Sequence, residues 1–294
     1  MDKFVNSFDR TRLYYNYSQG KNPHTLVFLH GVGSNWTIWK KELDFFQGKD
    51  FSTLALDLRG HGASQYHDEF EKYKIQYFSR DVNTILRMEN IDQFSLVGHS
   101  IGGGVAINYV MRYKSMFPSS LILIDSASTY PFDHNRLLNM SPYLTHFLRF
   151  IANHPPTLRK HFLHFKDVDL SLKGIKNDLH LISHLLHFTP LRSLVRALDN
   201  LEAYVFHSQK KIDIALHNLR IPTLVISGQY DATVPVKFAK MIKQLNQDAQ
   251  LKIIRGGHHA VIVEKPEQVN TTIYNFLQKQ VLLKSLKNGK NFGR

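Results

Sequence analysis

The sequence predicts an α/β protein with a mostly parallel central sheet and helices on both faces of that sheet. Short apolar runs alternate with longer segments of helical periodicity over residues 1–128, and the alternation resumes at residue 219. Strands that alternate with helices are typical of parallel βαβ units. The segment 129–218 breaks the alternation. We therefore expect a core formed by residues 1–128 and 219–294, with residues 129–218 inserted into it.

Composition and charge favour a globular chain without nucleic-acid or membrane motifs. The formal net charge is +13, but the basic residues are dispersed and form no run of five or more. We expect no specific nucleic-acid partner and only weak attraction to anionic surfaces. No apolar leader and no stretch of about 20 apolar residues occur, which predicts a cytoplasmic protein without a transmembrane segment. The absence of cysteine excludes disulfides and thiolate chemistry.

The elements of the core follow from the pattern in chain order. Residues 3–17 alternate around a turn at Asp9, which predicts an opening hairpin. Apolar runs then predict strands, and segments of helical spacing predict helices. Before the insertion these are strand 25–30, helix 36–47, strand 52–57, helix 72–89, strand 94–98, helix 101–113 and strand 120–125. After the insertion they are strand 222–227, helix 236–245, strand 250–254 and helix 266–282.

The inserted segment is expected to form a helical cap. Ser141-Pro142 and Thr189-Pro190 each place an N-cap residue before a proline that suits the first helical position. Apolar residues at helical spacing follow each pair, among them Phe147 and Leu194. A cap of this kind would cover the carboxyl ends of the strands and enclose an apolar pocket. That these side chains form only the cap's own core remains an alternative.

Histidines are concentrated in the insertion, which raises the question of a metal site. Ten of the 17 lie there, and His180 and His184 have the i, i+4 spacing that places two imidazoles on one helical face. Neither a glutamate between them nor a clear third ligand accompanies the pair. We therefore expect packed or solvated histidines, with no metal and no cofactor.

Ser100 lies in the pattern G-x-S-x-G, between Gly98 and Gly102. The residues before it predict a buried strand and those after it a packed helix, so Ser100 is expected at a strand-to-helix turn. A side chain at either glycine would clash with the facing backbone of such a turn. A strained turn that exposes a hydroxyl over the sheet suits a catalytic nucleophile.

Four further segments accompany this pattern in a fixed order. They are TLVFLHGVG at 25–33, LALDLRGHGAS at 54–64, PTLVISGQYD at 222–231 and LKIIRGGHHAVIVEKP at 251–266. With the serine pattern, they resemble the α/β-hydrolase family over residues 3–128 and 219–282. The resemblance implies the α/β-hydrolase fold, in which nucleophile, acid and histidine occur in that chain order.

The resemblance implies a Ser100, Asp231 and His259 triad, with one rival for the acid and one for the base. His259 precedes Glu264-Lys265-Pro266 by the family's spacing, whereas His258 stands where the family usually has glycine. Asp231 matches the family's acid segment, and Asp125, at the end of LILID, occupies a position that supplies the acid in some relatives. A structural role hydrogen-bonded to backbone is the plainer interpretation of Asp125.

The resemblance also implies two oxyanion donors, the backbone N–H groups of Val32 and Ile101. His30 is expected to orient the loop that carries Val32. Asp57 and Arg59, in the DLRGHGAS turn, are expected to be structural.

The resulting expectation is a serine hydrolase that cleaves a small-molecule apolar carboxylic ester through an acyl-enzyme, with thioesters and lactones as related substrates. Relatives that open epoxides use an aspartate, and serine cannot follow that route because its ether would be a dead end. A hydrolase of C–C bonds is an alternative that requires a cation for the substrate carboxylate, such as Arg192 or Arg196. A non-catalytic ligand receptor on the same fold is another.

Overall fold

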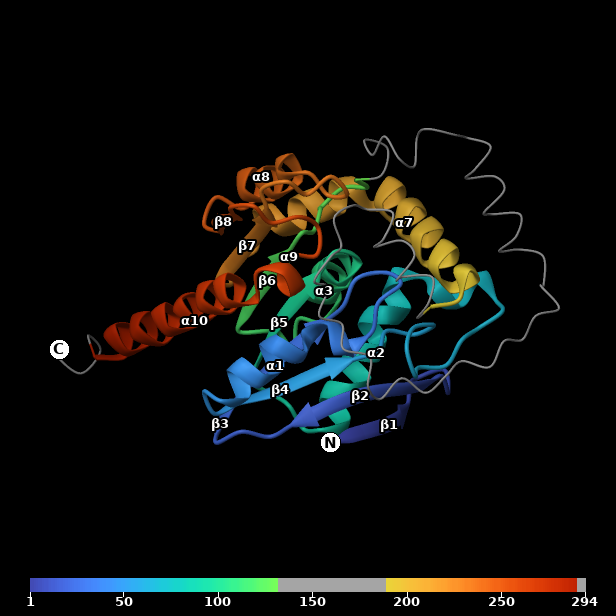
Figure 1. Cartoon of the computed structure of the whole chain (residues 1–294), viewed down its shortest axis with the longest axis horizontal. Coiled ribbons are helices and arrows are strands. Elements are labelled where there is room, and N and C mark those ends of the chain that lie inside the picture. Colours follow the sequence, from blue (N-terminus) through green and yellow to red (C-terminus); the bar gives the residue numbers. More distant parts are fainter. Residues whose placement is uncertain (132–188, 290–294) are drawn as a thin grey trace.

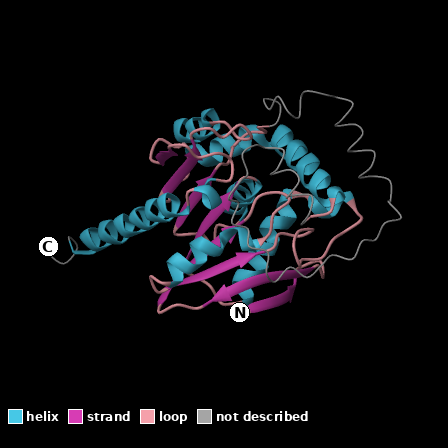
Figure 2. Cartoon of the chain, in the orientation of Figure 1, coloured by secondary structure: helices cyan, strands magenta, loops and turns pink. Residues whose placement is uncertain are grey.

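The computed structural model describes residues 1–131 and 189–289, and its centre is a sheet flanked by helices (Figures 1 and 2). The sheet has the strand order β1-β2-β4-β3-β5-β6-β7-β8. β2 pairs antiparallel with β1 and β4, and all later neighbours are parallel. The mostly parallel α/β class is confirmed. The strands are β1 (Asp2–Asn6), β2 (Arg12–Ser18), β3 (Asn22–Leu29), β4 (Phe51–Leu56), β5 (Phe94–His99), β6 (Ser120–Ile124), β7 (Thr223–Gly228) and β8 (Gln250–Ile254).

Two helical layers bury the two faces of the sheet. Successive residues of a strand point to opposite faces, and accordingly Leu96 packs with one hydrophobic cluster and Val97 with the other. The first cluster includes residues of α2, α3, α7 and α8, and the second includes residues of α1, α9 and α10. The helices are α1 (Lys40–Gln47), α2 (Ile75–Met88), α3 (Ile101–Arg112), α7 (Leu191–His217), α8 (Val236–Leu245), α9 (Val261–Glu264) and α10 (Pro266–Gly289).

The predicted elements of the core are present, with shifted ends. The opening hairpin is β1 and β2, and β8 has the predicted bounds. The helices expected at 36–47 and 72–89 each begin with a separate 3₁₀ turn, Trp36–Trp39 and Phe70–Tyr73. Asn35 caps the first of these turns through its side chain, which accepts a hydrogen bond from the Thr37 N–H. Such caps and tight turns shift helix ends without changing the apolar periodicity.

The helix expected after Thr189-Pro190 is α7, which spans 27 residues. Its C-terminal residues Ile212 and Leu216 are buried in the same cluster as the strands. The helix expected after Ser141-Pro142, with Phe147, and the pair His180 and His184 lie outside the described residues. The division into a core and a cap over 129–218 therefore stays a prediction.

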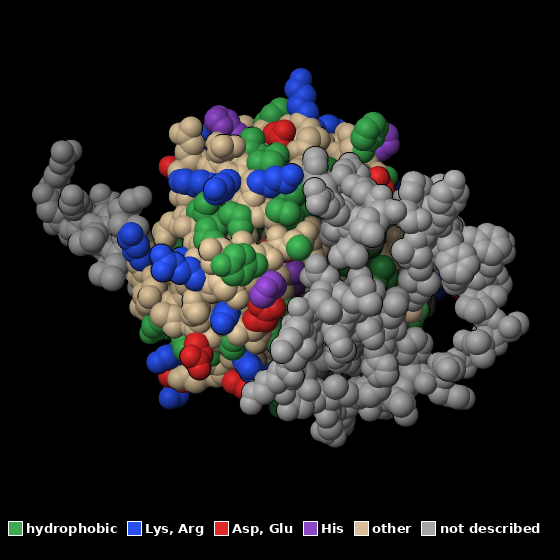
Figure 3. Space-filling model, turned by 45° about the horizontal axis from the view of Figure 1, so that its top comes forward, with side chains coloured by type: hydrophobic (Ala, Val, Ile, Leu, Met, Phe, Trp, Pro, Cys, Tyr) green, Lys and Arg blue, Asp and Glu red, His purple; other side chains and the backbone are tan. Residues whose placement is uncertain are grey.

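Basic residues are dispersed on the part of the surface that Figure 3 shows. Figure 3 shows Lys and Arg side chains spread over the face in view, interleaved with hydrophobic and uncharged groups. Within the described ranges, no helix combines the length and the apolar character that a membrane span requires.

Candidate active site

Ser100 occupies the turn between β5 and α3 in a conformation that L-residues rarely adopt. Its backbone angles are φ 54° and ψ −121°, in the strained positive-φ region. Glycines let the turn pack closely: a Cβ on Gly98 would lie 2.4 Å from the Gly102 carbonyl oxygen, and one on Gly102 would lie 2.2 Å from that of Leu29. The predicted strand-to-helix turn and its two glycine requirements are therefore present.

Three side chains from distant parts of the sequence form one hydrogen-bonded chain. The Ser100 hydroxyl lies 3.2 Å from Nε2 of His259, and Nδ1 of His259 lies 2.9 Å from Oδ2 of Asp231. Oδ1 of Asp231 accepts hydrogen bonds of 2.8 Å from the N–H groups of Thr233 and Val234. Because a carboxylate only accepts, Nδ1 of His259 carries the proton. Nε2 is then unprotonated and accepts the hydrogen bond from the Ser100 hydroxyl.

The two rival residues occupy other positions. His258 is more than half exposed, and its Nδ1 lies 3.0 Å from Oε2 of Glu264. The side chain of Asp125 is fully buried, and its Oδ1 accepts a 2.8 Å hydrogen bond from the N–H of Gly228. The structure thus brings His259 and Asp231, rather than His258 and Asp125, into the chain that reaches Ser100.

Val32 and Ile101 line the same cavity as Ser100. Ile101 is the first residue of α3, so its N–H has no carbonyl partner within the helix. The loop that carries Val32 approaches closely because Gly31 has no side chain: a Cβ there would lie 3.0 Å from Nδ1 of His99 and 3.2 Å from the Ser100 Cβ. This places the two expected oxyanion donors beside the serine.

Buried imidazoles support the loop after β3. Nδ1 of His30 donates to the Gly31 carbonyl at 2.7 Å, and its Nε2 accepts from the Leu58 N–H at 3.0 Å. Burial holds the pKa of His30 well below its ordinary value. The ring of His61 lies beside it, 5.2 Å away between centroids, and burial lowers its pKa to about 4. Both rings are neutral at physiological pH, so they orient the loop by hydrogen bonds and packing rather than by charge.

The turn after β4 is held by buried polar groups. Asp57 accepts 2.7 Å hydrogen bonds from the N–H groups of Trp36 and Ala63. Arg59 is fully buried and forms two 2.6 Å hydrogen bonds with the Asp81 carboxylate. These contacts agree with the structural roles expected from the DLRGHGAS motif.

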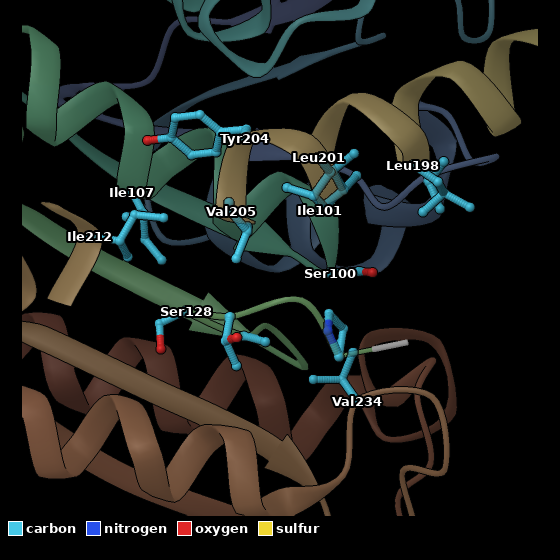
Figure 4. A pocket seen from close by; sticks show the side chains of 15 residues that line it. Ser100, Ile101, Ile107, Ser128, Leu198, Leu201, Tyr204, Val205, Ile212 and Val234 are labelled. Carbon is cyan, nitrogen blue, oxygen red and sulfur yellow. The ribbon is translucent and has the colours of Figure 1, made fainter. Parts of the chain in front are cut away.

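An apolar cavity opens beside Ser100, as Figure 4 shows. α3 and α7 form one side of it, and Ser128 and Val234 lie across from them. The sequence predicts an apolar pocket beneath the cap. Leu194 is not among the described residues that line the cavity, and the lining from α7 begins at Leu198. The lining from α7 comprises Leu198, Leu201, Tyr204, Val205 and Ile212.

His99, Asp125 and His259 have potential metal-ligand atoms within 4.8 Å of one another. All three groups already have hydrogen-bond partners, and that of Asp125 is the Gly228 N–H. His99 Nε2 lies 2.7 Å from the His259 carbonyl oxygen, and His259 Nδ1 is bonded to Asp231. We interpret the group as a hydrogen-bonded cluster.

The chain matches the model of a known protein family. The family described as "alpha/beta hydrolase fold" matches residues 24–266, which is most of the sequence and includes the whole hydrogen-bonded chain. The protein belongs to the alpha/beta hydrolase family. The resemblance seen in the sequence motifs is therefore confirmed, and so is the predicted α/β-hydrolase fold.

Relatives of this alpha/beta hydrolase include an epoxide hydrolase and a protein whose name states no activity. Epoxide hydrolase 3 of Xenopus tropicalis is 23% identical over 92% of this chain and 76% of its own length. Protein ABHD8 of Homo sapiens is 27% identical over 86% of this chain. The chain spans about half the length of that relative, since 54% of ABHD8 is covered.

Solved structures with the same fold include an esterase from Exiguobacterium antarcticum, with a TM-score of 0.71 and 18% identity. The superposition covers 95% of this chain and 100% of the esterase. The enol-lactonase from Burkholderia xenovorans has a TM-score of 0.68 and 17% identity, covering 94% of this chain and 100% of its own. At this identity the similarity establishes the fold alone.

Proposed function

We propose that this alpha/beta hydrolase is a serine hydrolase that cleaves a small or medium apolar carboxylic ester through an acyl-enzyme intermediate. The observation that carries the proposal is the continuous hydrogen-bonded chain from Ser100 through His259 to Asp231 beside an apolar cavity. A serine hydroxyl is a weak nucleophile unless a base takes its proton and a third group fixes the tautomer of that base. Thioesters and lactones present the same reactive carbonyl.

In the proposed reaction, Ser100 Oγ attacks the substrate carbonyl carbon while Nε2 of His259 takes the hydroxyl proton. Asp231 stabilises the imidazolium and keeps it oriented. The N–H groups of Val32 and Ile101 bind the oxyanion, each donor contributing roughly 3 kcal/mol. His259 then protonates the leaving alcohol, which leaves the acyl group on Ser100. A water molecule, deprotonated by His259, attacks the acyl-enzyme, and collapse of the second tetrahedral intermediate releases the acid.

The nucleophile argues against the activity named for the epoxide hydrolase relatives. An aspartate that opens an epoxide forms an ester, which water can hydrolyse at its carbonyl. Ser100 would instead form an ether, which has no carbonyl for water to attack. The esterase and the enol-lactonase among the structural neighbours are named for reactions that begin with attack at a carbonyl. This is chemistry that Ser100 can complete.

Hydrolysis of a C–C bond is the weaker candidate, because it needs a cation near the substrate carboxylate. Arg192 forms a 2.5 Å ion pair with Asp68, and Arg196 donates to the His67 carbonyl at 3.1 Å. Among the described residues that line the cavity, none is Lys or Arg. An apolar, uncharged lining favours an uncharged ester instead.

Labelling with a fluorophosphonate tests the proposal, because only an activated serine reacts. We expect one equivalent of label on wild type, located on Ser100 by peptide mass spectrometry, and none on Ser100→Ala. The same substitution should lower the kcat for p-nitrophenyl butyrate by about 10⁴-fold or more. A wild type that is neither labelled nor active would favour the receptor alternative. A Ser100→Ala variant that retains a tenth of the activity would contradict Ser100 as the nucleophile.

A further inference from the structure

His99, the residue before Ser100, makes a hydrogen bond that the proposed reaction does not use. Its Nε2 lies 2.7 Å from the main-chain carbonyl oxygen of His259, 160 residues later in the sequence. A carbonyl only accepts, so Nε2 of His99 carries the proton. The side chain is 4% exposed, and burial, followed by the nearby His259, lowers its pKa to about 3. His99 is therefore a neutral, fixed donor over the whole working pH range.

This hydrogen bond holds the backbone of His259, the proposed base. His259 lies in the loop after β8, beyond the last residue of strand pairing. Residues in such a loop are not held by the ladder of hydrogen bonds that fixes a strand. The His99 side chain instead ties this loop to the end of β5, the strand that leads directly to Ser100. The two imidazole rings pack beside one another with centroids 5.0 Å apart.

Asp125 forms a similar link to the loop that carries Asp231, the proposed acid. Its Oδ1 accepts from the Gly228 N–H at 2.8 Å, and the Gly228 carbonyl in turn accepts from the Asp231 N–H at 3.3 Å. Its Oδ2 lies 3.9 Å from Nε2 of His99. β5 and β6 are paired with His99 opposite Ile124, which brings these two side chains together.

We propose that His99 is a positioning residue, which holds the backbone of His259 so that Nε2 of the base stays aligned with Ser100. The inference rests on the proposed function and assigns His99 no contact with substrate. Asp125 acts alongside it by fixing the end of β7 that leads to Asp231. Misplacing a catalytic group by about 1 Å can cost on the order of 100-fold in rate, so one hydrogen bond to the base's own backbone has a measurable effect.

Two nearly isosteric substitutions separate hydrogen bonding from packing. His99→Gln keeps a side-chain N–H donor, whereas His99→Met has a similar shape and no donor. We expect His99→Met to lower kcat and the rate of fluorophosphonate labelling about 10- to 100-fold, with KM within twofold of wild type. His99→Gln should stay within about threefold of wild type in all three quantities. If His99→Met does not fold, as judged by circular dichroism, His99→Leu takes its place.

A proton NMR signal gives a readout that a merely structural role would not move. The Nδ1 proton of His259, bonded to Asp231, should give a sharp downfield resonance in wild type and His99→Gln, and should broaden or shift in His99→Met. The inference would be overturned if folded His99→Met had the kcat and the resonance of wild type. It would also be overturned if His99→Met and His99→Gln lost kcat equally. The resonance does not depend on turnover. An inactive wild type therefore contradicts the proposed function, while the comparison of resonances still decides the role of His99.

Discussion

Asp231 and Asp125 follow neighbouring strands, and their hydrogen bonds give them different roles. Asp231 accepts from Nδ1 of His259 and from two backbone N–H groups, which are three donors for one carboxylate. Asp125 accepts from the Gly228 N–H. Burial and the neighbouring Asp231 carboxylate raise the pKa of Asp125 well above its ordinary value. A neutral carboxyl there avoids placing two negative charges side by side.

An amide at each position distinguishes the two roles. We expect Asp231→Asn to lower kcat by about 10⁴-fold, because the amide group favours the wrong tautomer of His259. Asp125→Asn preserves a neutral group with an oxygen that can accept from Gly228, so its kcat should stay within about tenfold, with most of the change in the thermal midpoint. The kcat for p-nitrophenyl butyrate and calorimetry give the two quantities. Similar kcat losses for both variants would mean that the acid is shared between the two residues.

The individual site residues were predictable where a motif encodes them. Ser100, Asp231 and His259 each follow a strand end in a recognisable pattern, and the structure brings all three together. The contact between His99 and the His259 carbonyl was not predictable, because it depends on the path of the loop after β8. The choice between His259 and His258 rested on spacing alone, whereas in the structure their side chains face different partners.

At the level of elements, the first turn of α3 tolerates no Cβ at Gly102. A Cβ on Gly102 would lie 2.2 Å from the Leu29 carbonyl oxygen, whereas one on Gly104, in the same helix, would meet nothing closer than 3.5 Å. We expect Gly102→Ala to reduce the free energy of unfolding by about 3 kcal/mol or more, since backbone must move to accommodate it. Gly104→Ala should be neutral or stabilising by up to about 1 kcal/mol.

Urea titrations of both variants provide the measurement, and Gly104→Ala is the control for the general effect of alanine in a helix. Equal free energies of unfolding for the two variants would show that the turn relaxes more easily than its close backbone contact implies.

α7 is predicted to set the length of the acyl chain. Figure 4 shows Ile107, Tyr204 and Ile212 at the end of the cavity away from Ser100. Each methylene buried contributes about 0.8 kcal/mol until the cavity is full, so kcat/KM should rise and then fall along a series of p-nitrophenyl esters. Ile212→Ala should move the optimum to longer chains, and Leu194→Ala, on the same helix outside the described lining, should not. A flat profile for all three proteins would place specificity elsewhere.

The type of each element was predictable because the apolar periodicity is strong. The residues at which each element begins and ends were less predictable. α2 begins at Ile75 after a 3₁₀ turn, although the predicted helix begins at 72. α7 spans 27 residues without a break, and its C-terminal residues pack in the core cluster. The sequence instead predicts that the cap extends to residue 218. The apolar spacing of a helix that packs on a cap is the same as that of a helix that packs on a sheet, and only tertiary contacts separate the two.

For the whole molecule, buried histidines couple stability to pH. The pKa of His61 is about 4 in the folded chain, and an unfolded histidine has a pKa of about 6.5. Between these values only the unfolded chain binds the proton, so the stability that His61 provides is lost as pH falls from about 6.5 to about 4. Buried Glu42, Asp57 and Asp125, whose pKa values are raised by burial, have the opposite effect.

A single substitution isolates the histidine contribution from these opposing groups. Relative to His61→Gln, wild type should lose about 1.4 kcal/mol of unfolding free energy per pH unit between pH 6 and 4. Urea titrations at several pH values measure the difference. At pH 8 His61 is neutral in both states, so the difference there gives the cost of the substitution itself. A difference that does not change with pH would mean that His61 has the same pKa in the folded and the unfolded chain.

The order of strands in the sheet also affects how the protein folds. β6 pairs with β7 in register from Leu121 with Thr223 to Ile124 with Ile226, so the sheet closes only when segments about 100 residues apart meet. Contacts of this sequence separation form late and slow the folding of a chain. Ser100 can therefore meet His259 only after that closure. Under the proposed function, the appearance of phosphonate reactivity during refolding would time the completion of the fold, and a chain released before β8 is synthesised would be unreactive.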